Sequence, residues 1–298
     1  MTREVYIVDV FAERRFGGNP LGVVIHDDEV SDADMMPFAR ELNFSETTYV
    51  RRTPEPDGAF QVRIFTPTEE LPFAGHPTLG SAWVIREHLL EVRQDDVWLE
   101  MSAGRVPVHF ATESDGGEIV WLTAPTIELG SVWSAPDVYA TLGIPDASPV
   151  EGAPVVLASA GMPILIVPVA SLKELRACDL DSRAFRALAF TYVRQRFADT
   201  IVYVICAEAR EAGHGLAARM FIPQIPRVED PATGAAAACL GAYLLEHDLV
   251  EPDDLLIEQG CEMGRPSLLR VRAGSSDQGF RIQVGGKVRP VLGGQLCF

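Results

Sequence analysis

Apolar positions in this 298-residue chain recur mostly with the two-residue period of half-buried strands. Runs rich in β-branched residues, bounded by turn residues, predict two series of strands on either side of a proline-rich segment at about 124–153. The predicted strands are residues 5–11, 21–25, 46–51, 60–65, 97–101, 106–111, 119–122, 155–158, 164–169, 200–207, 216–221, 250–258, 267–273, 280–284 and 288–295.

Helical spacing is confined to a few segments, and each half of the chain has one dominant helix that follows several strands. These dominant helices are predicted at Thr78–Leu90, opened by Pro77, and at Gly234–Glu246. The other predicted helices are Ser31–Leu42 with Ser31 as N-cap, Pro136–Leu142, Leu172–Arg176 and Ser182–Tyr192. The order predicts an α+β fold in which a mainly antiparallel sheet wraps on a helix.

A pair of short motifs occurs once in each half. Arg-x-Phe-x-Pro is found at residues 63–67 and 219–223, and x-Pro-x-x-Gly-small-Ala follows at 76–82 and 230–236. The intervals, 156 and 154 residues, differ by only two. We interpret the repeat as two halves of like fold, in which His76 matches Asp230, and we expect the functional site to lie between them.

Composition excludes several classes of function. A formal net charge of −17 argues against a nucleic-acid partner, which would require clustered Lys and Arg. Five scattered cysteines without C-x-x-C indicate buried thiols in a reducing compartment, with neither disulfides nor a zinc site. There is no signal peptide and no apolar segment of transmembrane length, so we expect a cytoplasmic protein with no membrane partner.

Three ionisable residues are candidates for chemistry. His76 could exchange protons near neutral pH, although it could also be a buried histidine bonded to a carbonyl. Asp230 could equally be an N-terminal helix cap. On pattern alone, Glu46 is a solvent-facing strand residue.

Both dominant helices begin with small residues, Gly80-Ser81-Ala82 in one and Gly234-Ala235-Ala236 in the other. A helix N-terminus carries unpaired N–H groups and partial positive charge, so a ligand carboxylate could approach the backbone there. The alternative is that the small residues permit close packing of the helix on its sheet.

Further motifs extend over nearly the whole chain. They are Asp9-Val10-Phe11, Phe16-Gly17-Gly18-Asn19-Pro20, residues 41–47 (ELNFSET), Phe65-Thr66-Pro67, residues 73–80 (FAGHPTLG), Glu229-Asp230-Pro231-Ala232-Thr233-Gly234, Gln259-Gly260 and Gly264-Arg265-Pro266-Ser267. Together and in this order they resemble the PhzF family, the phenazine-biosynthesis isomerases related to diaminopimelate epimerase.

The resemblance implies the diaminopimelate epimerase-like fold: two pseudo-symmetric lobes, each a curled, barrel-like, mainly antiparallel sheet around a central helix. We place the lobes at residues 1–124 and 150–284, with the C-terminal strand near 285–298 as a candidate to return to the first lobe. The resemblance also implies a homodimer that needs no cofactor and no metal.

The same resemblance assigns roles to single residues. Glu46 falls on the family's catalytic glutamate, which moves a proton between carbons of one substrate, and His76 and Asp230 fall on its other catalytic positions. Gly75 and Gly234 lie where the family places backbone donors for a substrate carboxylate. Ala235 replaces the serine of the phenazine enzymes, and Ser81 takes the corresponding position in the first copy of the motif, so both are candidate substrate-binding residues.

These inferences predict a cofactor-independent isomerase acting on a small carboxylate-bearing molecule. We expect a partly apolar cleft to raise the pKa of Glu46, so that this residue can serve first as base and then as acid. Two alternatives stay open. One is a racemase or epimerase of amino-acid-like acids that uses groups other than thiols, and the other is a ligand-binding member with weak or no turnover, which the loss of the serine hydroxyl at Ala235 would favour.

Overall fold

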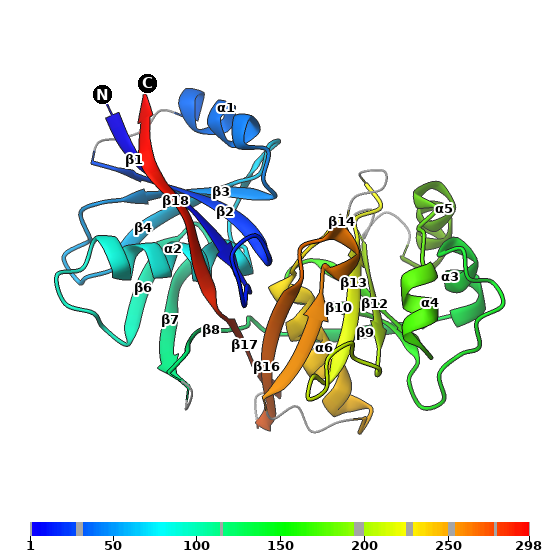
Figure 1. Ribbon diagram of the computed structural model, residues 1–298. Coiled ribbons are helices and arrows are strands. Elements are labelled where there is room, and N and C mark those ends of the chain that lie inside the picture. Colours follow the sequence, from blue (N-terminus) through cyan, green and yellow to red (C-terminus); the bar gives the residue numbers. More distant parts are fainter. Residues whose placement is uncertain are drawn as a thin grey trace. The chain divides into compact units, whose positions relative to one another are not determined.

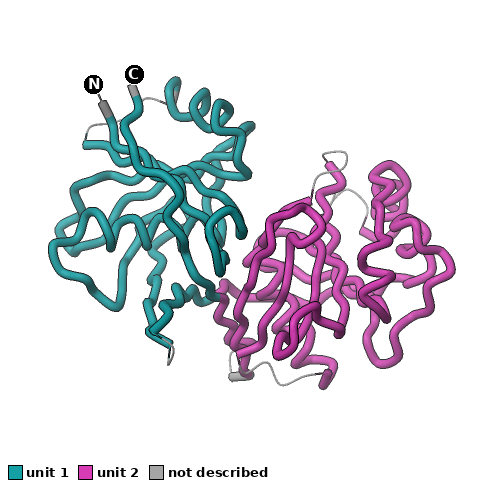
Figure 2. Tube along the Cα trace, viewed as in Figure 1, with its two compact units in different colours: residues 1–123, 285–298 teal, residues 124–284 magenta. Residues whose placement is uncertain are grey.

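The computed structural model describes residues 2–27, 32–113, 116–193, 200–224, 229–249, 254–276 and 279–297. Within these ranges the chain is a mixture of strands and helices, which confirms the α+β class. It forms two compact units (Figure 2). Unit 1 contains residues 1–123 and 285–298, and unit 2 contains residues 124–284.

Unit 1 is a sheet with two crossover helices. In pairing order its strands are β18 (Val288–Cys297), β1 (Thr2–Val10), β2 (Asn19–His26), β3 (Glu46–Arg51), β4 (Phe60–Phe65), β6 (Asp96–Met101), β7 (Gly104–Thr112) and β8 (Glu118–Thr123), and β5 (Glu70–Leu71) pairs with the end of β4. The pairs β2–β3 and β4–β6 are parallel, so each needs a crossover. Helix α1 (Asp32–Leu42) provides the first and α2 (Gly75–His88) the second. The chain ends lie side by side because Thr2 pairs with Cys297 (Figure 1).

Unit 2 repeats this order. Its strands are β9 (Glu128–Trp133), β10 (Val155–Ser159), β11 (Pro163–Val169), β12 (Ile201–Cys206), β13 (Leu216–Phe221), β15 (Leu255–Gln259) and β16 (Ser267–Ser276), and β14 (Glu229–Asp230) pairs with the end of β13. The parallel pairs are β11–β12 and β13–β15. Helices α4 (Leu172–Ala177) and α5 (Ser182–Val193) cross over in the first pair and α6 (Gly234–Glu246) in the second. The remaining elements within the described ranges are α3 (Ala135–Thr141), the short helix η2 (Cys261–Met263) and β17 (Gly279–Gly286).

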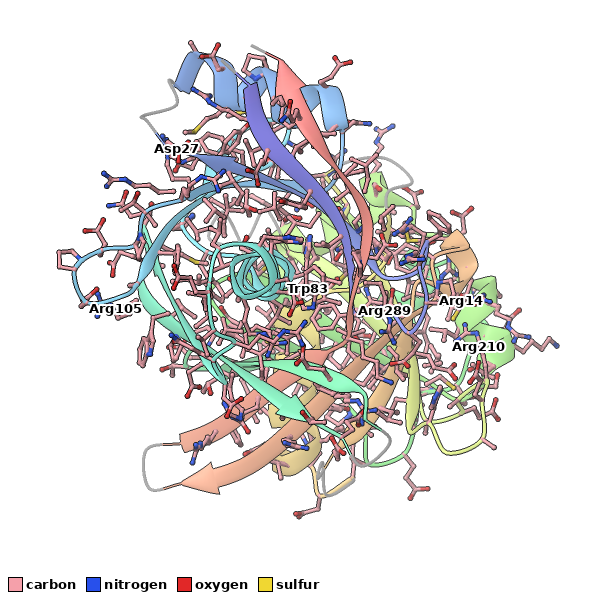
Figure 3. The ribbon with its side chains drawn as sticks, turned by 60° about the vertical axis from the view of Figure 1, so that its left-hand side comes forward. Arg14, Asp27, Trp83, Arg105, Arg210 and Arg289 are labelled. Carbon is pink, nitrogen blue, oxygen red and sulfur yellow. The ribbon has the colours of Figure 1, made fainter. Side chains whose placement is uncertain are left out.

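Each sheet has an inner face that packs on one long helix and an outer face covered by shorter helices. In unit 1, α2 contacts β1, β2, β3, β6, β7 and β8, and α1 covers an outer cluster that includes Met35, Tyr49 and Phe65. Figure 3, in which Trp83 marks α2, looks nearly along this helix with strands around it. In unit 2, α6 contacts β9, β10, β11 and β16, while Val202 and Val204 of β12 belong to the outer cluster under α3, α4 and α5.

The structure agrees with most of the predicted elements and corrects a few. Helix α6 has the predicted bounds, whereas α2 begins three residues before the predicted Thr78, because Pro77 occupies its first turn. Strand β9 lies in the segment predicted as an irregular crossover; four of its six residues are polar, glycine or exposed, so it lacks an apolar alternation. Ser31, predicted as a cap, and residues 250–253 of a predicted strand lie outside the described residues.

Candidate active site

Glu46 lies at the start of β3 and faces α2. Side chains alternate along a strand, so Glu46 shares a face with Thr48, whose hydroxyl accepts a hydrogen bond from Ser81 of α2 at 2.8 Å. Two strand residues advance by about 6.7 Å, close to the roughly 7.5 Å between His76 and Ser81 along the helix. The geometry that brings Ser81 to Thr48 therefore brings His76 to Glu46.

The two side chains meet in a largely buried setting. His76 Nε2 is 3.3 Å from Glu46 Oε2, and the side chains are only 6% and 16% exposed. Burial lowers the pKa of His76 to about 3, so the imidazole is neutral at pH 7. A neutral imidazole can donate to a carboxylate or accept from a carboxylic acid. His76 is therefore a suitable partner for Glu46 both when the carboxyl group is ionised and when it is protonated.

The helix that carries His76 begins without a side-chain cap. Ala74 is its N-cap, the first turn has no acidic residue, and Thr78 instead donates to the Ala74 carbonyl at 2.7 Å. Pro77 has no N–H, so the amides of Gly75 and His76 form the positive end of the helix. Such an end favours a bound carboxylate.

Gly80 and Ser81 lie further along α2 and face the sheet. A Cβ on Gly80 would come within 2.6 Å of Leu21 and 2.9 Å of Val10, so glycine there permits close helix–sheet packing. Ser81 is fully buried against Thr48. These contacts agree with the packing alternative for the small residues, and a role of Ser81 in binding substrate stays a prediction.

Asp230 belongs to unit 2 and lies in the short strand β14. The cap interpretation of Asp230 is wrong, because α6 begins at Gly234 with Thr233 as N-cap and no side-chain cap bond. Asp230 instead accepts a hydrogen bond through Oδ2 from the Thr233 hydroxyl. A bond from a hydroxyl to a carboxylate is charge-assisted and fixes the orientation of the acid.

Gln259 holds the segment between Asp230 and α6. Its Nε2 donates to the Asp230 carbonyl at 2.7 Å and to Thr233 Oγ1 at 3.1 Å, and its Oε1 accepts from the Thr233 amide at 3.3 Å. Gly260 has a positive φ of 73° and lies so close to Pro231 that a Cβ would be 2.6 Å from the Pro231 carbonyl oxygen. This explains the Gln259-Gly260 motif: the glutamine orients the acid segment and the glycine makes room for it.

The strand registers correct one predicted equivalence. Glu70 pairs with Phe65 and Glu229 with Phe221, and the interval from 70 to 229 is 159 residues, as is the interval between the helix starts at 75 and 234. His76 therefore matches Ala235, and Asp230 matches Leu71. The motif x-Pro-x-x-Gly suggested a match of His76 with Asp230 because it aligned Pro77 with Pro231, which lie at different points relative to their helices.

Sequence reasoning named Glu46, His76, Asp230, Gly75 and Gly234, and the structure brings the first two together within unit 1. Gly75 and Gly234 are the first residues of their helices, and Ala235 follows in the first turn of α6, partly buried. The roles of Thr233 and Gln259 were not predicted from the sequence. A hydroxyl three residues after Asp230, just before a helix, was the available signal for Thr233, whereas Gln259 is far away in sequence.

The cysteine side chains that the structure describes do not suggest a thiol mechanism. Cys178, Cys206, Cys239 and Cys261 are free thiols, and burial raises the pKa of Cys239 in α6 to about 12. In the described ranges no group of three or more His, Cys, Asp or Glu side chains is placed to hold a metal ion. Among the helices of the same ranges, none has the length and apolar character needed to span a membrane.

A family model described as "Phenazine biosynthesis-like protein", PhzC-PhzF, matches residues 8–294. The chain belongs to this family. An uncharacterised isomerase of Mesorhizobium japonicum is 36% identical over 99% of both chains. A trans-2,3-dihydro-3-hydroxyanthranilate isomerase of Pseudomonas chlororaphis is 35% identical over 94% of both. A PhzF-family crystal structure from Bacillus anthracis shares the fold, with a TM-score of 0.88 over 100% of both chains at 23% identity.

Membership confirms the resemblance seen in the motifs and makes this PhzF-family chain an isomerase. The family match covers both the Glu46–His76 pair and the Asp230 segment. The predicted cytoplasmic location, homodimer and lobe boundaries stay predictions.

Proposed function

We propose that the chain is a cofactor-independent isomerase that moves a proton within a small carboxylate-bearing substrate. The observation that carries the proposal is the buried contact between Glu46 and the neutral His76 at 3.3 Å. The first candidate substrate is trans-2,3-dihydro-3-hydroxyanthranilate, the compound in the name of the Pseudomonas chlororaphis relative.

In the proposed reaction, Glu46 removes a proton from an activated carbon and returns it to another carbon of the same molecule. The C–H electron pair moves into the substrate's π system, and the second C–H bond forms as that system shifts. Atoms and electrons balance within one molecule, so no oxidant or reductant takes part. Glu46 acts as base and then as acid, which is general acid–base catalysis by one group.

The other residues have supporting roles in this proposal. His76, neutral and in contact with Glu46, orients the carboxyl group and donates to it or accepts from it as the proton moves. Asp230, oriented by Thr233, binds a polar group of the substrate in its ionised or protonated form. Each uncapped helix start, at Gly75 in unit 1 and at Gly234 in unit 2, offers backbone amides that suit a carboxylate.

The test is turnover of trans-2,3-dihydro-3-hydroxyanthranilate in D₂O, followed by proton NMR, for the parent chain and Glu46→Gln. Loss of the carboxylate should lower kcat by about 10³-fold, within the range for a general acid–base group. Glu41→Gln is the matched control, because Glu41 is an exposed acid on α1 only five residues away. A folded Glu46→Gln protein with parental turnover would overturn the assignment of Glu46.

The same experiment separates the alternatives. Deuterium incorporation with inversion at one carbon would indicate a racemase or epimerase, whereas deuterium at a second carbon supports the proton shift. Binding measured by calorimetry without turnover, and unchanged affinity in Glu46→Gln, would indicate a ligand-binding protein.

A further inference from the structure

Tyr203 in β12 differs from every other tyrosine of the chain in its hydrogen bonding. The side chain is fully buried, and its hydroxyl has no hydrogen-bond partner among the residues that the structure describes. The chain has six tyrosines, and the hydroxyl of each of the other five makes a hydrogen bond: Tyr6 with Glu4, Tyr49 with Met35, Tyr139 with Pro168, Tyr192 with Ser134 and Tyr243 with Pro154.

A buried hydroxyl without a partner costs free energy, and phenylalanine would fill nearly the same volume without that cost. The cost is acceptable where the hydroxyl is used in a state other than the resting one. The three tyrosines that are as deeply buried as Tyr203 each donate to a main-chain carbonyl, which fixes them as structural residues. Tyr203 lacks this explanation.

Strand register places Tyr203 on the inner face of its sheet, level with Asp230. Tyr203 pairs with Met220, and Met220 pairs with Asp230, so the three side chains point to the same face. Two strand spacings, roughly 9.6 Å, separate the Tyr203 and Asp230 backbones, and a tyrosine side chain can cross much of that distance. By the same registers Tyr203 matches Thr48 of unit 1, which contacts α2 through Ser81.

Electrostatics agree with this placement. Burial raises the pKa of the Tyr203 phenol, and the charge of Asp230 raises it further. The phenol therefore stays protonated at neutral pH and offers one O–H donor. Asp230 accepts from Thr233 through Oδ2, and a carboxylate has about four lone-pair sites, so it can accept several donors at once.

We propose that Tyr203 is a positioning residue for Asp230, whose carboxylate accepts a hydrogen bond from the Tyr203 hydroxyl when substrate is bound. The inference rests on the proposed function in one respect: it takes Asp230 as a group that meets the substrate. Tyr203 acts through Asp230 and does not itself contact the reacting atoms.

The first test compares Tyr203→Phe with Tyr139→Phe and Tyr243→Phe, two buried tyrosines of the same unit whose hydroxyls donate to carbonyls. Tyr203→Phe should unfold at the same temperature or a higher one, because it removes an unpaired group, yet lose 10- to 100-fold in kcat/KM. The pH profile of its kcat, which reports groups in the enzyme–substrate complex, should move upward in pH, because Asp230 loses a donor that favours its ionised form. The controls should unfold at lower temperature and keep kcat/KM within twofold. Parental kcat/KM and pH profile in Tyr203→Phe would overturn the proposal.

A double variant then shows whether Tyr203 works through Asp230. Adding Tyr203→Phe to Asp230→Asn should change kcat/KM by less than twofold, whereas a full 10- to 100-fold further loss would contradict the mechanism.

A measurement without turnover keeps this test separate from that of the proposed function. The Tyr203 resonance in ¹³Cζ-tyrosine-labelled protein is assigned by its disappearance in Tyr203→Phe. Because the charge of Asp230 acts on the Tyr203 phenol even without substrate, the resonance should shift as Asp230 titrates, and this step should be absent in Asp230→Asn. A Tyr203 resonance that responds identically to pH in the parent and in Asp230→Asn overturns the coupling, whatever the substrate proves to be.

Discussion

The starts of α2 and α6 occupy matching places in the two units but carry different chemistry. At α2 the first turn has His76, and the facing strand β3 begins with Glu46. At α6 the matching positions are Ala235 and, on β12, Ile201, while the acid is Asp230 in the short strand before the helix. The repeated scaffold therefore fixes two uncapped helix ends, and the ionisable groups are placed independently on it.

The residues that do repeat are structural. Arg63 pairs with Glu70 and lies over Phe65 at 5.0 Å, and Arg219 pairs with Glu229 and lies over Phe221 at 4.7 Å. Each Arg–Glu pair ties the short strand before the helix to the long strand beside it. A repeated motif is thus better evidence for a shared fold than for a shared catalytic role, and the following predictions test this distinction.

The largest effect is expected from removing the buried copy of the arginine. Arg219 is buried and also donates to the carbonyls of Leu175 and Cys178, at 3.0 and 2.7 Å. Arg219→Ala leaves these groups and Glu229 unpaired. It should lower the free energy of unfolding, measured in urea, by about 3–5 kcal/mol. Arg63→Ala, whose side chain is 36% exposed, should cost about 1 kcal/mol or less. Equal losses of unfolding free energy in the two variants would show that burial does not make Arg219 more important for stability than Arg63.

Because Arg219→Ala could prevent folding, Arg219→Lys provides a milder version of the same test. Lysine keeps the charge but loses the paired geometry with Glu229, so its cost should again exceed that of Arg63→Lys.

A smaller loss of stability is expected from Gly260→Ala, in the segment that holds Asp230. Gly260 has a φ of 73°, and its Cβ would be 2.5 Å from the Arg265 oxygen, so strain and a backbone clash should together cost at least about 2 kcal/mol. Gly264→Ala is the matched control, with a φ of 72° and no atom within 4 Å of the Cβ, so it measures the strain alone. If the two variants lose equal stability, the close contacts of Gly260 with Arg265 and Pro231 have no energetic role.

The neutral His76 should make stability depend on pH. Its pKa is about 3 in the folded chain and about 6.5 in an unfolded one, so the unfolded chain binds the extra proton between these values. Stability should therefore fall as pH falls below about 6.5, by roughly 2 kcal/mol between pH 7 and pH 5. His76→Gln should lack this component. Parallel stability curves for the two proteins in urea would show that His76 is not held neutral.

Most of the fold followed from the sequence, because apolar period and turn residues are local signals. The strands at 46–51, 60–65 and 216–221 have the predicted bounds, as does α6. The two-residue strands β5 and β14 were missed, because they are defined by pairing with β4 and β13 and have no period of their own. Strand β9 was missed for lack of an apolar alternation.

The site was predictable where a motif marked it and not where distant segments meet. The repeated motif pointed to His76 and the family resemblance to Glu46, and only the structure shows their contact, since it depends on the packing of α2 on β3. Gln259 is 29 residues from Asp230 in the chain, and its side chain donates to the Asp230 carbonyl. The two residues meet because β15 pairs in parallel with β13 after the α6 crossover. The unpaired hydroxyl of Tyr203 has no sequence signal at all, because a tyrosine in an apolar strand is usual.

The smallest effect is expected at Ala235, the position in unit 2 that matches His76. Ala235→Ser adds a hydroxyl at a partly exposed position in the first turn of α6, so stability should change by no more than about 0.5 kcal/mol. One added hydrogen bond to substrate should raise kcat/KM for trans-2,3-dihydro-3-hydroxyanthranilate by about 2- to 10-fold. Ala236→Ser is the control, because residue 236 is fully buried and its hydroxyl should lower stability without improving turnover. If Ala235→Ser leaves kcat/KM unchanged, the side chain at this helix start does not touch the substrate, and chemistry at the two helix starts differs more than their shared scaffold suggests.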